Sequence, residues 1–195
     1  YHAERVMNLA LHIQKSEGGI VDIIAASALV HDIYRPWEKR TGKSHFGQEA
    51  LEMMREVLED SDIPSEKIKP ILNIVALHDI YDWTEKMPDK SIELQIVQDA
   101  DNLDAIGAIG VARTFTFGGA NGADMYVPGE NLTFDNDFKE KPGEKSSTIA
   151  HFYEKLLKLR DHMNTNEGRA IAKKRHKLMI DFLEAFFGEW EISDG

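Results

Sequence analysis

Apolar residues along this 195-residue chain recur mainly at the three- and four-residue spacing of an amphipathic helix. The alternation of apolar and polar residues that marks a half-buried strand is scarce. The spacing predicts a first helix that Gly18-Gly19 ends, and a second over about 21–33 that Pro36 ends. A third is predicted over about 45–58, and a fourth has Ser65 as its N-cap. Further helices are predicted over about 92–117, 147–163 and 167–188. The fold class is therefore all-α, an irregular helical bundle.

One long segment interrupts this helical pattern. Residues 119–147 contain turn-forming pairs such as Asn121-Gly122, Pro128-Gly129 and Pro142-Gly143. A loop of this length without structure of its own is uncommon and often functional, so it is either a lid or binding loop, or a disordered insertion. We expect a single domain over residues 1–195. It comprises a metal-binding helical core over 1–118, this loop, and C-terminal helices over 148–195.

Composition narrows the class of partner. The net charge is −11, which argues against binding to a nucleic acid polymer or to an anionic membrane surface, because both require a basic surface. No apolar run approaches the roughly 18 residues of a membrane span. The chain has no cysteine, which rules out disulfides and thiolate metal ligands and fits a cytoplasmic location. Its first residue is Tyr1 rather than Met, so we expect residues to precede it in the native protein.

Acidic and imidazole side chains gather in three widely separated motifs. They are His2 in His-Ala-Glu-Arg-Val, the pair His31-Asp32 in Leu-Val-His-Asp-Ile, and Asp101 in Gln-Asp-Ala-Asp-Asn-Leu. Two imidazoles and two carboxylates form a mixed nitrogen and oxygen set that suits a divalent metal. Asp101 and Asp104 share one face of the predicted helix, where a buried carboxylate is costly unless it is paired or bound to metal. The alternative for this face is a solvated acidic surface or a salt bridge at the helix end.

The order of these motifs is more specific than any one of them. Over roughly residues 1–118 the chain resembles the HD superfamily of metal-dependent phosphohydrolases. The resemblance lies in the order His-x-x-Arg-Val, then an apolar residue with His-Asp, then Asp-Ala-Asp-x-Leu-Asp. The resemblance implies an HD-domain fold and assigns the metal ligands. It also points to the small stand-alone HD hydrolases, some of which have been linked to nucleotide pyrophosphohydrolysis. The implied ligands are His2, His31, Asp32 and Asp101.

The same resemblance implies a function. A divalent ion (Mn, Mg, Fe, Co or Ni) would activate water to attack a nucleotide or another small phosphate ester or anhydride. The expected partner is thus a small phosphorylated substrate, and a homodimer is compatible with the sequence. The chain lacks the Gly-Tyr-Pro signature of the cyclic-dinucleotide phosphodiesterase branch. The alternatives are a dinuclear HD phosphodiesterase or oxygenase, and a nucleotide-binding regulator with a degenerate site.

Three further residues are candidates for catalysis. His78 shares a helix face with apolar residues, and His45 opens the predicted third helix, where a donor can meet an anion. Each is expected to contact phosphate or water, to bind a second metal, or to be structural. Asp104 is expected to orient a ligand or to act as a general acid or base.

Three cations are candidates for substrate binding. Arg35 stands one turn beyond His31, and its planar fork suits phosphate oxygens. Lys39 belongs to the same basic stretch, which either contacts substrate or is a solvated loop. Arg113 is expected to reach the long loop or the substrate, and its spacing does not decide between them.

Overall fold

The computed structural model of the chain describes residues 1–80, 90–133 and 146–191. Regular structure in these ranges is helical throughout, which confirms the all-α prediction. The chain divides into two compact units, Tyr1–Asp101 with Asn164–Gly168, and Asn102–Met163 with Arg169–Gly195. The single-domain arrangement stays a prediction. In the part of the chain that is described, no helix combines the length and apolar character needed to cross a membrane.

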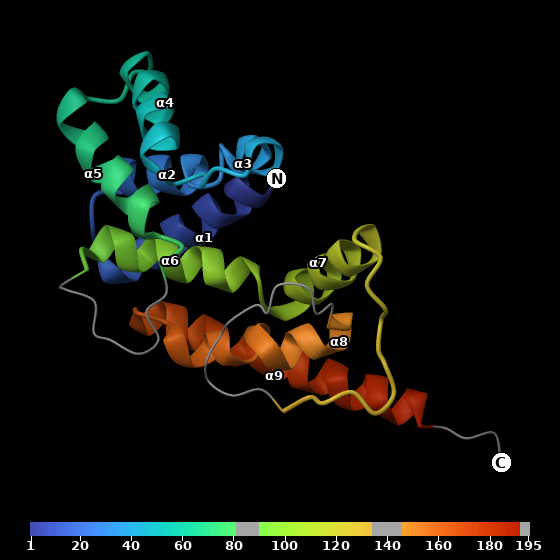
Figure 1. The fold of residues 1–195 in the computed structure, drawn as a ribbon. Helices are drawn as coiled ribbons and strands as arrows, with labels where there is room; N and C mark the ends of the chain where they lie inside the picture. The colour runs from blue at the N-terminus through green and yellow to red at the C-terminus, as the bar shows by residue number, and fades with distance from the viewer. Residues whose placement is uncertain (81–89, 134–145, 192–195) are drawn as a thin grey trace. The chain divides into compact units, whose positions relative to one another are not determined.

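The first unit is built from the N-terminal helices (Figure 1). They are α1 (His2–Glu17), α2 (Val21–Val30), α3 (Arg35–Thr41), α4 (Gln48–Glu59), α5 (Ser65–Leu77) and most of α6 (Ile92–Asp104). Helix α2 packs against both α1 and α5, and α4 packs against α5. Apolar side chains at helical spacing, such as Val6 and Ile13 of α1 and Ile71 and Val75 of α5, are fully buried and form the core of this unit.

The second unit is formed by α7 (Gly107–Ala120), the short α8 (Thr148–His151) and most of α9 (Asn166–Trp190). Between α8 and α9 the chain forms a π-helical turn, Phe152–Leu156, and a 3-10 turn, Lys158–His162. The ring of buried Phe152 stacks on that of Phe182, with centroids 5.8 Å apart. Met179 and Leu183 of α9 are buried as well, so one face of this helix contributes to a core.

The segment after Pro36 differs from the prediction. We expected Pro36 to end the second helix, but α2 ends at Val30 and Pro36 lies in the first turn of α3. Proline is tolerated there because the backbone N–H groups of a first helical turn have no partner within the helix. The basic stretch around Lys39 is therefore helical rather than a loop.

Two other predicted boundaries were wrong. The helix expected over 92–117 is interrupted, because α6 ends at Asp104 and α7 begins at Gly107. Gly107 has a φ of 76°, a left-handed conformation that other residues rarely adopt. Ser65 is the first residue of α5, and Pro64 occupies the N-cap position instead. Residues 134–145 of the expected loop lie outside the described residues, so its role as a lid stays a prediction.

Candidate metal centre

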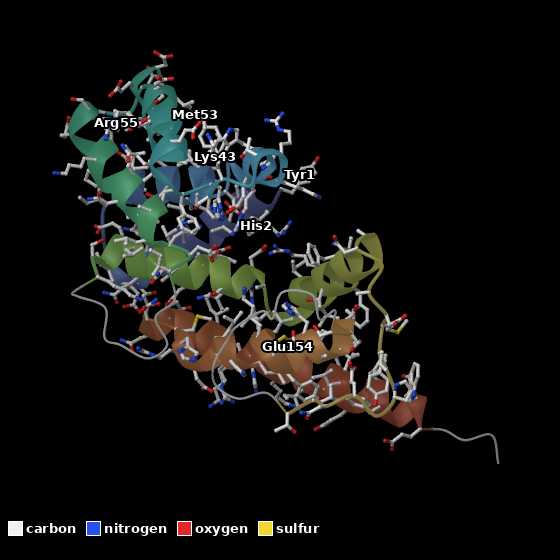
Figure 2. The ribbon with its side chains drawn as sticks, viewed as in Figure 1. Tyr1, His2, Lys43, Met53, Arg55 and Glu154 are labelled. Carbon is white, nitrogen blue, oxygen red and sulfur yellow. The ribbon has the colours of Figure 1, made fainter. Side chains whose placement is uncertain are left out.

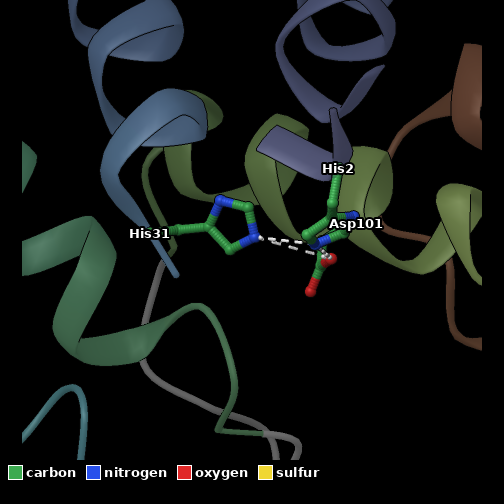
Figure 3. A group of neighbouring side chains, drawn as sticks. All are labelled: His2, His31 and Asp101. Carbon is green, nitrogen blue, oxygen red and sulfur yellow. Dashed lines mark hydrogen bonds and ion pairs between the residues drawn. The ribbon is translucent and has the colours of Figure 1, made fainter. Parts of the chain in front are cut away.

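Side chains from three helices converge at one point of the first unit. His2 is the first residue of α1, His31 is the C-cap of α2, and Asp101 comes from α6. Figure 2 shows His2 at the start of α1 beside Tyr1, and Figure 3 shows the three side chains directed at one another. The Nε2 atom of His2 lies 3.2 Å from Nε2 of His31 and 3.3 Å from Oδ1 of Asp101. The His31 Nε2 to Asp101 Oδ1 distance is 3.7 Å.

Asp32 completes this group. Its Oδ2 atom lies 3.6 Å from Nε2 of His2 and 3.8 Å from Nε2 of His31. Neighbouring ligands of an octahedral divalent ion, each about 2.1 Å from the metal, lie about 3 Å from one another. Donor atoms of His2, His31 and Asp101 all lie within 4.8 Å of one another, and Asp32 lies beside both imidazoles, so these nitrogen and oxygen donors suit a divalent ion.

Backbone contacts fix the orientation of two imidazoles. Nδ1 of buried His31 donates to the carbonyl oxygen of Ala28 at 2.8 Å, and Nδ1 of buried His78 donates to that of Val75 at 2.7 Å. Because a carbonyl oxygen only accepts, the proton of each neutral ring resides on Nδ1. Nε2 of each ring then carries the lone pair that a metal or a water proton requires.

The charges of the cluster favour a cation. Burial raises the pKa of Asp101, but the neighbouring imidazoles of His2 and His31 outweigh this effect and lower that pKa well below its ordinary range. Burial likewise raises the pKa of Asp32, and the neighbouring His45, His31 and Arg35 lower it far more. Both carboxylates are consequently ionised. Burial lowers the pKa of His78, which favours its neutral form.

The structure also brings His45 and His78 to Asp32. Nε2 of buried His45 lies 3.3 Å from Oδ1 of Asp32, and its Nδ1 lies 2.9 Å from Oε2 of Glu38. Both contacts are within ion-pairing distance, although neither has hydrogen-bond geometry. Nε2 of His78 lies 3.9 Å from the same Oδ1 atom of Asp32. The two histidines therefore lie beside Oδ1 of Asp32, whereas Oδ2 faces His2.

Arg35 lies beside the cluster, but carboxylates hold its guanidinium. Its Nε donates to Oδ1 of Asp32 and one terminal nitrogen donates to Oδ2 of Asp79, both at 2.9 Å. The other terminal nitrogen lies 3.4 Å from Oε2 of Glu38. The sequence analysis did not single out Asp79 or Glu38. A signal existed for Asp79, because it follows His78 as Asp32 follows His31.

Three candidates from the sequence remain, Lys39, Asp104 and Arg113. Lys39 is exposed on α3. Asp104 and Arg113 belong to the second unit, where Arg113 donates to the carboxylate of Asp104 and, at 3.2 Å, to its backbone carbonyl. The roles expected of Lys39, Asp104 and Arg113 in the site stay predictions.

A fully buried carboxylate that the sequence analysis passed over is Asp99. It accepts hydrogen bonds from the backbone and side chain of both Asn164 and Thr165, at 2.7–2.9 Å. These residues precede α9, so Asp99 ties the start of that helix to α6. Asp99 and Asp101 are two positions apart in α6, yet only Asp101 contacts the imidazoles of His2 and His31.

A helical fold with this His, His-Asp and Asp donor set is typical of one class of metal-binding domain. The HD-domain family model matches residues 1–106 of the chain. The protein therefore belongs to the HD-domain family, which confirms the resemblance found in its motifs.

Several relatives match most of the chain. An HD-superfamily hydrolase from Bacillus thuringiensis is 37% identical, with a TM-score of 0.75 over 99% of this chain and 86% of that chain. The uncharacterized protein YpgQ of Bacillus subtilis is 33% identical over 184 residues, or 94% of this chain and 80% of YpgQ. A crystal structure of Bacillus subtilis YpgQ in complex with ADP is 30% identical, with a TM-score of 0.75 over 100% of this chain and 87% of that chain.

Proposed function

We propose that this protein is a metal-dependent phosphohydrolase that acts on a nucleotide or another small phosphate ester or anhydride. The observation that carries the proposal is the convergence of Asp32 and Asp101 on the imidazoles of His2 and His31. Each carboxylate has an oxygen 3.3–3.8 Å from Nε2 of both rings, and the two Nε2 atoms lie 3.2 Å apart. Membership of the HD-domain family and likeness to a structure named as an HD-superfamily hydrolase support the reaction class. The ADP complex of YpgQ supports a nucleotide as the ligand.

The chain would hold one divalent ion (Mn, Mg, Fe, Co or Ni) with His2, His31 and Asp101, and with Asp32 beside them as the fourth ligand. When bound, such an ion supplies Lewis acidity, which acidifies water and offsets the charge of a phosphoryl group. The protein's part is to orient the donors. The Ala28 carbonyl holds the ring of His31, and Arg35 holds one oxygen of Asp32, so that the other oxygen faces His2.

His78 and His45 supply proton-handling groups next to this set. Because Nδ1 of His78 donates to the Val75 carbonyl, Nε2 of the neutral ring is an acceptor suited to hold a water and take its proton. Buried His45 lies between the carboxylates of Glu38 and Asp32, within ion-pairing distance of both, and is the second candidate to contact substrate or water.

One observation favours a second candidate. Donor atoms of His31, Asp32 and His78 also lie within 4.8 Å of one another. A second ion held there would favour the dinuclear phosphodiesterase or oxygenase chemistry known among HD proteins. Counting metal ions per chain by native mass spectrometry separates the two candidates, because the mononuclear hydrolase holds one.

The proposal is tested with a panel of nucleotides and small phosphate esters in the presence of Mn²⁺, Mg²⁺, Co²⁺ or Ni²⁺, with phosphate and pyrophosphate as products. We expect release from a nucleotide that requires added metal and is lost in Asp32→Ala. The matched control is Asp22→Ala, which alters an exposed aspartate of the same region. Absence of product with every metal, in protein that binds the ion fully, would rule out the proposed reaction.

The expected partners rest on charge. The net charge of −11 favours a small phosphorylated substrate over a nucleic acid polymer. A homodimer and a cytoplasmic location stay predictions.

A further inference from the structure

Helices α2 and α5 end in the same local arrangement. Each has a histidine as its C-cap, His31 or His78, and that histidine donates Nδ1 to the carbonyl three residues earlier. An aspartate follows in both cases, within Leu-Val-His-Asp-Ile and Ala-Leu-His-Asp-Ile. The chain thus carries two copies of a helix-terminal His-Asp pair. The proposed metal site uses the carboxylate of Asp32, and that of Asp79 is not among its ligands.

The two copies lie side by side because α2 and α5 run parallel. Near their N-terminal ends, Lys67 of α5 donates to Asp22 of α2 at 2.6 Å. At their C-terminal ends, the rings of His31 and His78 meet edge to face with centroids 5.1 Å apart. This alignment brings both aspartates within reach of one cation.

Arg35 is that cation. Its Nε holds Oδ1 of Asp32 and a terminal nitrogen holds Oδ2 of Asp79, each at 2.9 Å. A planar guanidinium that is fixed by two carboxylates on different edges has one orientation, and a lysine ammonium has no equivalent fork. With Oδ1 of Asp32 held in this way, Oδ2 is left to face His2 and His31.

We infer that Asp79 is a positioning residue of the metal site: it fixes Arg35, and Arg35 fixes the carboxylate of Asp32. This inference rests on the proposed function, because it takes Asp32 as a ligand. An ordinary surface ion pair would affect stability slightly and metal affinity not at all. Partners that orient a ligand typically change metal affinity 10- to 100-fold when they are removed.

The test is Mn²⁺ binding to metal-free protein, measured by isothermal titration calorimetry for wild type, Asp79→Asn, Arg35→Lys and the double variant. We expect Asp79→Asn to raise the Kd for Mn²⁺ about 10-fold or more. Because Asp79 acts through Arg35, the double variant should bind no more weakly than Arg35→Lys alone. Asp22→Asn is the matched control, since it removes the ion pair at the other end of the same two helices and should keep the wild-type Kd.

Three results are decisive. The inference is overturned if Asp79→Asn, and Asp79→Ala as a second variant, both bind Mn²⁺ with a Kd within twofold of the control. It is also overturned if the increases in Kd caused by Asp79→Asn and Arg35→Lys multiply in the double variant. If Arg35 binds only a substrate phosphate, Arg35→Lys retains the wild-type Kd for Mn²⁺, and that result would overturn the inference as well. If the wild-type protein binds Mn²⁺ but hydrolyses no substrate, only the proposed function is contradicted. If it binds no divalent ion, both the proposed function and the role of Asp79 are contradicted.

Discussion

His31 illustrates how single residues define this site. Its side chain has no exposed surface, yet both ring nitrogens have a polar contact, Nδ1 with the Ala28 carbonyl and Nε2 with the donor cluster. A buried polar group without a partner is costly in free energy, so a buried histidine is stable where both of its ring nitrogens have a polar contact. Asp99 shows the structural counterpart, because its carboxylate accepts hydrogen bonds from Asn164 and Thr165 before α9.

At this scale we predict that Asp99→Ala destabilises the fold without removing the metal. The substitution leaves the backbone N–H groups of Asn164 and Thr165 without an acceptor, and each such buried group costs about 1–3 kcal/mol. The free energy of unfolding in urea should fall by roughly 3 kcal/mol. Asp60→Ala, at the exposed end of α4, serves as the control and should stay within about 0.5 kcal/mol of wild type. Equal losses in both variants would contradict the role given to Asp99.

Among the elements, the break between α6 and α7 depends on one glycine. A Cβ atom at Gly107 would lie 2.8 Å from Cγ of Arg175, and the φ of 76° strains any other residue. Arg175 is itself held in place, because it donates to the carbonyl of Leu103 near the end of α6. The left-handed turn at Gly107 therefore ends one helix and starts the next.

Gly107→Ala is accordingly expected to lower the free energy of unfolding by about 1–3 kcal/mol. Gly119→Ala offers a matched comparison, since Gly119 lies within α7 and a Cβ there meets nothing within 4 Å. That variant should be stabilised by about 0.4–1 kcal/mol, because alanine loses less backbone entropy in a helix. Thermal unfolding of the two variants side by side measures the contrast, and a stable Gly107→Ala protein would refute the strained turn.

For the molecule as a whole, the metal site links folding to ion binding. Two ionised carboxylates, Asp32 and Asp101, each lie within 3.6 Å of the same nitrogen of His2, in a protein whose net charge is already −11. A cation that binds only the folded state offsets this repulsion and stabilises the fold by mass action.

We therefore expect Mn²⁺ at about 100 times its Kd to stabilise the protein by about 2.7 kcal/mol, or roughly 5–10 °C in Tm, and EDTA to reverse the shift. His78→Ala should keep this thermal shift, because the mononuclear site does not use His78 as a ligand. Its turnover should fall strongly, because the variant lacks the imidazole proposed to accept a proton from water. Loss of one of two bound ions in His78→Ala, counted by mass spectrometry, would instead establish the dinuclear site.

The sequence by itself determined the helical class, most helix positions and the identity of the candidate ligands. Helical periodicity is a local property, and the motifs around His2, His31 and Asp101 carry their own flanking residues, so both can be read along the chain. The helix over 92–117 was predicted too long, since apolar spacing continues across the turn that Gly107 makes possible.

Only the tertiary structure decided which polar residues support the site and which support the fold. Arg35 meets Asp79 across 44 positions of sequence, and Asp99 meets Thr165 across 66. Such pairs depend on how α2, α5 and the start of α9 pack, and no local pattern encodes that packing. The same packing places Arg35 between the carboxylates that follow α2 and α5, and its expected contact with a substrate phosphate stays a prediction.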